Sequence, residues 1–397
     1  MSAAEPSPSR RIAATDEPCI VAMQRVLASA APPADKAPML SLAQGIVYWG
    51  PPAEALGDAA AAVSQSVTSA YGADDGAPEL RQKIQGKLEA ENGLSGVQVM
   101  LTSGANQAFM NVVMALVDPG DKVGVVPPFY FNHVMALQMN AAEIVHLEPD
   151  PETLLPAVTA ESLAGLKMLV LCNPNNPSGV VMSKQHLEEI AAACAAAGTW
   201  LVVDNTYEYF VYGDAVHTCV GGPHVVNVFS FSKAYGMMGW RLGYLAYPAA
   251  LEGALMKVQD TIPICPPIIS QTLALKAMDF GRDWVRTHFD VVEANRDTVR
   301  GALEAALEGT DGQVFGGDGA IYLFARLPSA LPDDGAVVER LAKEHGVVTI
   351  PGGACGAPGH FRVAFANLDA DTCRRAAARL TEGLRTLLAE ATAAAQA

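Results

Sequence analysis

The sequence predicts an α/β protein with a large domain, built on a mostly parallel seven-stranded sheet between helices, and a smaller α+β domain. Three observations predict this. The chain has 397 residues, enough for two lobes that share a core. Short apolar runs alternate with helical patterns, and this rhythm changes beyond about Trp284. The expected strands of the large sheet are 97–102, 123–126, 144–147, 168–172, 200–204, 225–229 and 242–246.

The two ends of the chain are expected to form the smaller domain. A helix is predicted over 17–31, and prolines then break it before an irregular stretch at 40–52, of a kind that often lies across a cleft. After residue 284 come a long helical stretch, strands near 320–325, 347–350 and 361–365, and a closing alanine-rich helix. The expected divisions are an N-terminal segment of the small domain at 1–45, the large domain at 46–284 and the C-terminal small domain at 285–397.

The composition excludes several kinds of partner. The balance of 26 Lys and Arg against 42 Asp and Glu gives a net charge of -16, which repels nucleic acid and anionic membrane surfaces. No apolar stretch approaches a membrane span, and residues 1–15 lack the apolar core of a signal peptide, so we expect a cytoplasmic protein. The seven cysteines form no C-x-x-C pair and are interpreted as reduced core thiols, and we expect no metal site.

Ligand sites in such sheets form at the carboxyl ends of the strands, and polar segments follow four of the predicted strands. Residues 103–107, Ser-Gly-Ala-Asn-Gln, follow a strand and open a helix, so their backbone N–H groups would form an anion cradle. An ordinary turn and helix cap is the alternative. Residues 173–179, Asn-Pro-Asn-Asn-Pro-Ser-Gly, combine rigid prolines with asparagine amides, although a tight surface turn explains them equally well.

The other two segments carry charged groups. Asp204, in Asp-Asn-Thr-Tyr, ends an apolar strand and can pair with a cationic ring nitrogen, unless it is only a helix cap beside a core tyrosine. Residues 230–244 place two hydroxyls, Lys233 and Arg241 in a glycine-punctuated stretch. A lysine among Phe, Tyr, Met and Trp is partly desolvated, which favours its neutral, nucleophilic amine and suits Schiff-base chemistry.

These four segments, in this order and spacing, resemble the class I/II aminotransferases of fold type I, which depend on pyridoxal 5'-phosphate (PLP). The resemblance covers nearly the whole chain and implies that the large domain binds PLP. It implies that Lys233 carries the cofactor as a Schiff base and acts as general acid and base, with Asp204 on the pyridine nitrogen and Tyr207 on the ring oxygen as further catalytic residues. The remaining cofactor-binding residues that it implies are Gly104, Ala105, Asn106, Tyr130, Asn176, Ser230, Arg241 and Tyr71.

The same resemblance implies a substrate site and a homodimer. Arg362 matches the arginine that clamps the substrate carboxylate, and Gly45, Tyr48 and Asn176 are the other expected substrate contacts. Tyr71 matches the tyrosine that reaches the cofactor phosphate of a neighbouring subunit. For Arg362 the alternative is a surface arginine on a strand, and for Tyr48 and Trp49 it is a packing role.

The substrate is expected to be an amino acid with an uncharged or aromatic side chain. Family members specific for dicarboxylates supply a second arginine from a region placed here near 257–267, and this stretch contains no arginine and carries Asp260. Residues 42–49, 204–210 and 230–244 also resemble the plant aromatic aminotransferases. There methionine is the typical amino donor and an aromatic 2-oxo acid such as indole-3-pyruvate or phenylpyruvate the acceptor.

Two other functions are alternatives to transamination. A PLP-dependent lyase acting on a sulfur amino acid would use the same Lys233, Asp204 and Arg362, and the cofactor motifs do not exclude it. A cofactor-binding sensor fused to a DNA-binding module would need a helix-turn-helix region and usually a basic patch, and the sequence shows neither.

Overall fold

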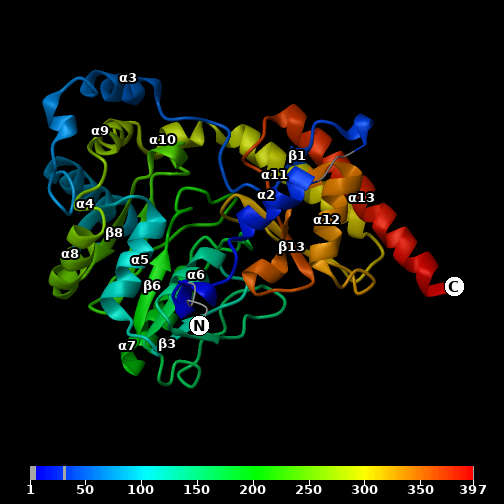
Figure 1. Ribbon diagram of the computed structural model, residues 1–397, viewed down its shortest axis with the longest axis horizontal. Coiled ribbons are helices and arrows are strands. Elements are labelled where there is room, and N and C mark those ends of the chain that lie inside the picture. Colours follow the sequence, from blue (N-terminus) through cyan, green and yellow to red (C-terminus); the bar gives the residue numbers. More distant parts are fainter. Residues whose placement is uncertain (1–5, 30–32, 397) are drawn as a thin grey trace, which may run out of the picture.

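The large domain is built on one seven-stranded sheet, seen on the left of the computed structural model in Figure 1. The structure describes residues 6–29 and 33–396. The strand order is β2-β8-β7-β6-β5-β3-β4, and only β8 runs against its neighbours. This confirms the predicted sheet. The strands are β2 Gln98–Thr102, β3 Lys122–Val125, β4 Glu143–His146, β5 Met168–Cys172, β6 Trp200–Asp204, β7 Val225–Ser230 and β8 Gly243–Tyr247.

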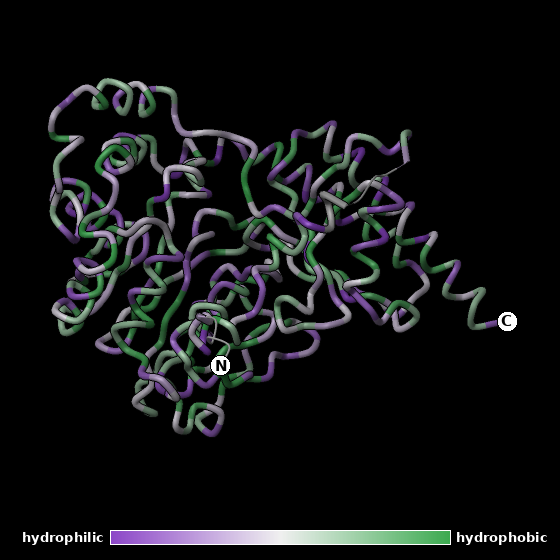
Figure 2. Tube along the Cα trace, in the orientation of Figure 1, coloured by the Kyte–Doolittle hydropathy of each residue, from purple (hydrophilic) through white to green (hydrophobic). Residues whose placement is uncertain are grey.

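Helices cover both faces of this sheet because its central strands are apolar on both sides. Val170 and Val202 pack in one cluster with Phe109 of α5, whereas Leu171 packs on the opposite face with α7. The central strands are hydrophobic along most of their length (Figure 2). The large-domain helices are α3 Ala53–Ala62, α4 Pro78–Asn92, α5 Ala105–Leu116, α6 Phe131–Met139, α7 Lys184–Ala197, α8 Glu252–Thr261, α9 Ile268–Ala277 and α10 Gly281–Arg286.

The smaller domain combines a four-stranded antiparallel sheet with three longer helices. The sheet has the order β12-β13-β10-β9, where β9 is Gln313–Gly316, β10 Tyr322–Arg326, β12 Ile350–Pro351 and β13 His360–Ala364. The helices are α11 Phe289–Leu307, α12 Asp334–His345 and the alanine-rich α13 Ala370–Gln396, which was predicted. The sequence interpretation missed β9 and took 347–350 as one strand, whereas the chain forms two short ones, β11 Val347–Val348 and β12.

The N-terminal segment joins both domains. Strand β1 Leu40–Ser41 pairs in parallel with β11, and helix α2 Cys19–Ser29 packs against α12 of the small domain. Residues 30–31 of the predicted first helix lie outside the described residues. The short helix α1 Arg10–Ala13 instead packs on α6 of the large domain. The domain limits at 45/46 and 284/285 stay predictions.

Short 3-10 turns complete the architecture at Ala34–Lys36, Ser66–Ser69, Met238–Trp240, Ala249–Leu251 and Gly352–Cys355. Within the described part of the chain, no helix is both long and apolar enough to cross a membrane.

A buried ion pair joins α4 to the segment that follows β6, and we expect it to contribute to stability. Lys87 of α4 contacts Glu208 with side-chain exposures of 9% and 10%, so Lys87→Met leaves a buried carboxylate without its cation. We expect the free energy of unfolding to fall by about 3 kcal/mol, measured by urea denaturation. Lys83→Met is the matched control, because Lys83 pairs with Asp279 at exposures of 31% and 49%. It should cost less than about 1 kcal/mol, and equal losses in the two variants would contradict the argument.

Candidate active site

A pocket of about 230 Å³ lies at the carboxyl ends of the central strands, where the two domains meet. Of the predicted site residues, Gly104, Tyr48 and Tyr71 are outside its lining, and the others form part of it. Its walls are Ile20, Gly45, Ala105, Asn106, Tyr130, Phe131, Cys172, Asn176, Asp204, Thr206, Tyr207, Ser230, Ser232, Lys233, Arg241, Tyr322 and Arg362.

Lys233 places an amine in the pocket. It follows β7 in a tight loop, and its Nζ donates a hydrogen bond to the carbonyl oxygen of Gly45. Burial, together with the positive charges of Arg241 and Arg362, lowers the pKa of the Lys233 amine to about 8. About one-tenth of the side chain is therefore the neutral, nucleophilic amine at pH 7, and far less would be neutral at the ordinary lysine pKa.

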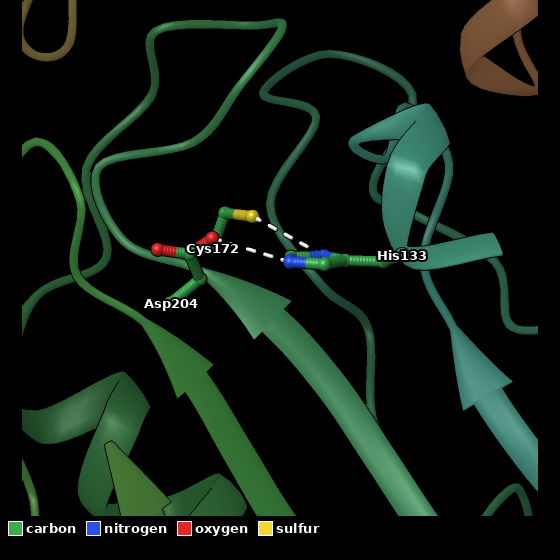
Figure 3. A group of neighbouring side chains, drawn as sticks. All are labelled: His133, Cys172 and Asp204. Atoms are coloured by element: carbon green, nitrogen blue, oxygen red, sulfur yellow. Dashed lines mark hydrogen bonds and ion pairs between the residues drawn. The ribbon is translucent and has the colours of Figure 1, made fainter. Parts of the chain in front are cut away.

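Asp204 is a buried carboxylate that its neighbours hold in place. Thr206 donates to Asp204 Oδ1 from its backbone nitrogen at 2.9 Å and from its hydroxyl at 2.6 Å. On the other oxygen, His133 Nε2 lies 3.2 Å from Oδ2. The second ring nitrogen of His133 faces Cys172 Sγ at 3.9 Å, so the three side chains form a short polar chain (Figure 3). Asp204 can therefore offer its charge to the pocket from a fixed position.

The same three side chains have the donor types of a metal site. One ligand atom from each of His133, Cys172 and Asp204 lies within 4.8 Å of the others. The two nitrogens of His133 face different partners, and burial raises the pKa of the Cys172 thiol well above its usual value, which keeps the sulfur protonated. We interpret the group as a hydrogen-bonded chain, and the absence of a metal stays a prediction.

One corner of the pocket is suited to a phosphate. Helix α5 begins beside Gly104, whose φ of 91° lies in the left-handed region, and its N-terminus has no side-chain cap. A Cβ on Gly104 would lie 2.3 Å from Arg241 Nη2, so only glycine allows this guanidinium to lie against the helix start. Ser230, at the end of β7, lines the same pocket.

Arg362 of β13 is a buried cation that crosses from the small domain to the large one. Its Nη1 donates to Asn176 Oδ1 at 2.9 Å and its Nη2 to the carbonyl of Ala43 at 2.8 Å. Its guanidinium lies 4.4 Å from the ring centre of Tyr322. Among the described residues, Arg362 Nε is buried without a hydrogen-bond partner. A carboxylate in the pocket would satisfy that donor.

Two tyrosines predicted at the cofactor lie in the pocket wall. The hydroxyl of Tyr207 lies 2.6 Å from that of Tyr322. Tyr130 donates to Asn106 Oδ1 at 3.4 Å and accepts from Asn132 at 2.9 Å. Burial, together with the neighbouring Tyr322 and Asp204, raises the pKa of Tyr130 to about 12, so this ring stays neutral.

Two of the predicted contact residues, Tyr48 and Tyr71, lie outside the pocket. Tyr48 is 38% exposed and lies against Trp49 and His288, outside the pocket. Tyr71 is 79% exposed on the surface. Trp49 is buried and donates from Nε1 to the carbonyl of Ala234 at 3.3 Å, which agrees with the packing alternative for that residue. The roles of Tyr48 and Tyr71 stay predictions.

Several pocket residues were missed from the sequence. Ile20 and Phe131 belong to helices with ordinary apolar spacing, and Tyr322 lies within an expected strand, so none carried a local mark of function. Thr206 and Ser232 stood inside the motifs and their hydroxyls could have been singled out.

Residues 37–380 match a family described as aminotransferase class I and II. The chain belongs to this family. It is 47% identical over 390 residues to the aromatic aminotransferase ISS1 of Arabidopsis thaliana, covering 96% of this chain and 97% of the relative. It is 31% identical to the aspartate/prephenate aminotransferase of Thermus thermophilus, covering 81% and 85% of the two chains.

A solved structure confirms the fold type I architecture. A single mutant of Thermus thermophilus aspartate aminotransferase superposes with a TM-score of 0.86 at 27% identity, covering 96% of this chain and all of that one. The enzyme is a PLP-dependent aminotransferase. Its pocket fits this cofactor, since it holds an amine of lowered pKa, a buried carboxylate and an anion corner made by Arg241 and the start of α5.

The lowered pKa of Lys233 predicts how the cofactor-free enzyme takes up PLP. Because the neutral amine is the attacking form, the loading rate should rise with pH and level off above a midpoint near 8. The measurement is the growth of lysine-bound cofactor absorbance after mixing, at a series of pH values. Lys233→Ala is the control and should show no such absorbance. A midpoint near the ordinary lysine value of 10.5 would contradict the assigned environment.

Proposed function

We propose that this aminotransferase moves an amino group between an uncharged or aromatic amino acid, with methionine as the expected donor, and an aromatic 2-oxo acid, phenylpyruvate or indole-3-pyruvate, in a ping-pong mechanism. The observation that carries the proposal is the buried Nε of Arg362, a hydrogen-bond donor without a partner that a carboxylate could use, in a pocket that Ile20 and Phe131 also line. The name of the Arabidopsis relative, an aromatic aminotransferase, also supports it. The cytoplasmic location stays a prediction.

The lack of a second substrate cation supports an uncharged side chain. Within the described lining, the cations are Lys233, Arg241 and Arg362, and we assign the first two to the cofactor. Residues 257–267 supply no arginine. A second substrate carboxylate would therefore be desolvated without a partner, at a cost of several kcal/mol.

Each residue has a definite task in this reaction. When bound, PLP supplies an electrophilic carbon and an electron-accepting ring. Lys233 Nζ would hold that carbon between turnovers and, once free, would take the proton from the substrate α carbon and return it as general acid. Asp204, oriented by Thr206, would hold the protonated ring nitrogen.

The binding groups surround these residues. Arg362 would bind the substrate carboxylate through its free Nε, with Gly45 and Asn176 beside it. The phosphate would lie against Ser230, Arg241 and the backbone of 104–106, where the positive end of α5 stabilises an anion. Tyr130 would stack on the ring, and Asn176 and Tyr207 would hydrogen-bond its oxygen.

The substrate assignment predicts turnover that depends on an acceptor. Enzyme loaded with PLP is given L-methionine with and without phenylpyruvate or indole-3-pyruvate, and phenylalanine or tryptophan is measured. Product should form only when the acceptor is present, and aspartate should replace methionine poorly because its second carboxylate finds no cation.

Two results would contradict this assignment. Release of ammonia or a thiol without an acceptor would support a PLP-dependent lyase instead. A clear preference for aspartate would show that a cation from outside this pocket enters the site. Arg362→Lys is a useful companion, because it keeps the charge but loses the planar fork, and it should raise KM for every amino acid by about tenfold or more.

We also infer that the active unit is a homodimer. Large apolar side chains are exposed on the stretches that follow α3 and α8: Val63 is 65% exposed, Val67 60%, Ile262 50% and Ile264 37%. Tyr71 lies beside them, since the neighbouring Gly72 nitrogen contacts Cys265 Sγ at 3.4 Å. Burial of this surface against a second copy would bring Tyr71 toward the partner's phosphate corner.

Mixing two inactive variants tests this arrangement. One variant, Lys233→Ala, lacks the amine in its own site. The other variant, Tyr71→Ala, keeps its own amine but lacks the phosphate contact that its Tyr71 is predicted to offer to the partner's site. A mixed dimer contains one site with both an intact Lys233 and an intact Tyr71, so mixing should restore activity at limiting PLP. Activity no higher than the sum of the separate variants, or a monomer by light scattering, would contradict the shared site.

A further inference from the structure

Tyr322 is held by contacts on both its hydroxyl and its ring. It lies in β10 with 1% exposure, and its hydroxyl is 2.6 Å from that of Tyr207. The Arg362 guanidinium lies over its ring at 4.4 Å from the centre. Tyr322 therefore touches two residues of the active site at once and has little freedom to turn.

Gly45 leaves the space that this hydroxyl occupies. A Cβ at position 45 would lie 1.9 Å from the Tyr322 hydroxyl oxygen and 2.9 Å from the ring carbon that carries it. Any larger residue would have to push the phenol away from Tyr207. The glycine in the segment at 42–49 is thus explained by Tyr322 as well as by the contact of its carbonyl with Lys233.

In the contact between the two hydroxyls, one hydroxyl donates its proton and the other accepts it. Burial raises the pKa of both phenols, well above the usual value for Tyr207, and the positive charge of Arg362 opposes this effect most strongly at Tyr322, whose ring it contacts. The phenol that is more easily deprotonated is the better donor. This difference favours Tyr322 as the donor of the short contact and the Tyr207 oxygen as its acceptor.

We propose that Tyr322 is a positioning residue for Tyr207: its hydroxyl donates to the Tyr207 oxygen and so leaves the Tyr207 proton free to point into the pocket. With its own oxygen already accepting, Tyr207 becomes a stronger donor, since hydrogen bonds in a chain polarise one another. Arg362 and Gly45 support this geometry from either side of Tyr322.

The consequence concerns the proton on Lys233 Nζ when this nitrogen holds the cofactor. This step rests on the proposed contact of Tyr207 with the ring oxygen of the cofactor. A stronger donor on that oxygen stabilises its negative charge and makes the neighbouring nitrogen less basic. Tyr322 would thereby lower the pH at which the resting enzyme loses that proton, acting through Tyr207.

Tyr322→Phe tests the proposal because it removes the hydroxyl and keeps the ring over Arg362. The absorbance of the PLP-loaded enzyme is titrated with pH in the absence of substrate, so the result is independent of the substrate assignment. We expect the midpoint to rise by about half a pH unit, the scale of one weakened hydrogen bond. Tyr207→Phe should raise it further.

Tyr212→Phe is the matched control. Tyr212 is also buried, and its hydroxyl donates to the carbonyl of Ala320 at 2.8 Å, outside the pocket. Like Tyr322→Phe, the Tyr212→Phe variant loses one buried hydroxyl, so we expect a similar effect on folding. Its titration midpoint should stay at the wild-type value. Gly45→Ala is a second variant that displaces the Tyr322 hydroxyl while keeping it, and it should shift the midpoint in the same direction as Tyr322→Phe.

The double variant Tyr207→Phe/Tyr322→Phe decides how Tyr322 acts. If Tyr322 acts through Tyr207, adding its substitution to Tyr207→Phe should give no further shift. An equal shift in that background, or a Tyr322→Phe midpoint no different from that of Tyr212→Phe, would overturn the proposal. An unchanged midpoint in Tyr207→Phe would overturn it too, by removing the contact on which it rests, and would leave the amino donor and acceptor unaffected.

Discussion

The buried guanidinium of Arg362 is the interaction on which the site depends. It comes from β13 of the small domain, yet it binds Asn176 of the large domain and the carbonyl of Ala43 in the N-terminal segment. Its charge also lowers the pKa of Lys233, after burial and Arg241, and contacts the ring of Tyr322. Because one cation joins three parts of the chain, the pocket forms only when the two domains are in contact. The geometry of the clamp and the reactivity of the lysine are thus set together.

Much of this arrangement could be predicted because it is local in sequence. Asp204, Ser230 and Lys233 stand at or just after the ends of apolar strands, and a parallel sheet brings such ends to one edge whatever the loops do. The seven strands were recognised for the same reason, since each is a short apolar run bounded by turn residues. The structure places these residues in one pocket, as the motif spacing indicated.

The rest depends on contacts between distant segments. Strand β9 ends at Gly316, next to Gly317 and Asp318, so its sequence reads as a turn until β10 pairs with it. The role of Tyr322 depends on its contacts with Tyr207, Gly45 and Arg362. These residues lie 40 or more positions away in the sequence and come from three different segments. Tyr48 is the opposite case: it stands in a motif close to the predicted contact Gly45, yet it is exposed and lies outside the pocket.

The charge of the whole protein and the charge of the pocket have opposite signs. A net charge of -16 repels polyanions, but the described lining holds Lys233, Arg241 and Arg362 against the single carboxylate of Asp204. Over a Debye length of about 8 Å these buried groups, rather than the surface, set the field that a small anion feels. A phosphate at one end and one carboxylate at the other would balance the pocket cations. An uncharged side chain then adds no charge that the apolar wall around Ile20 and Phe131 would have to solvate.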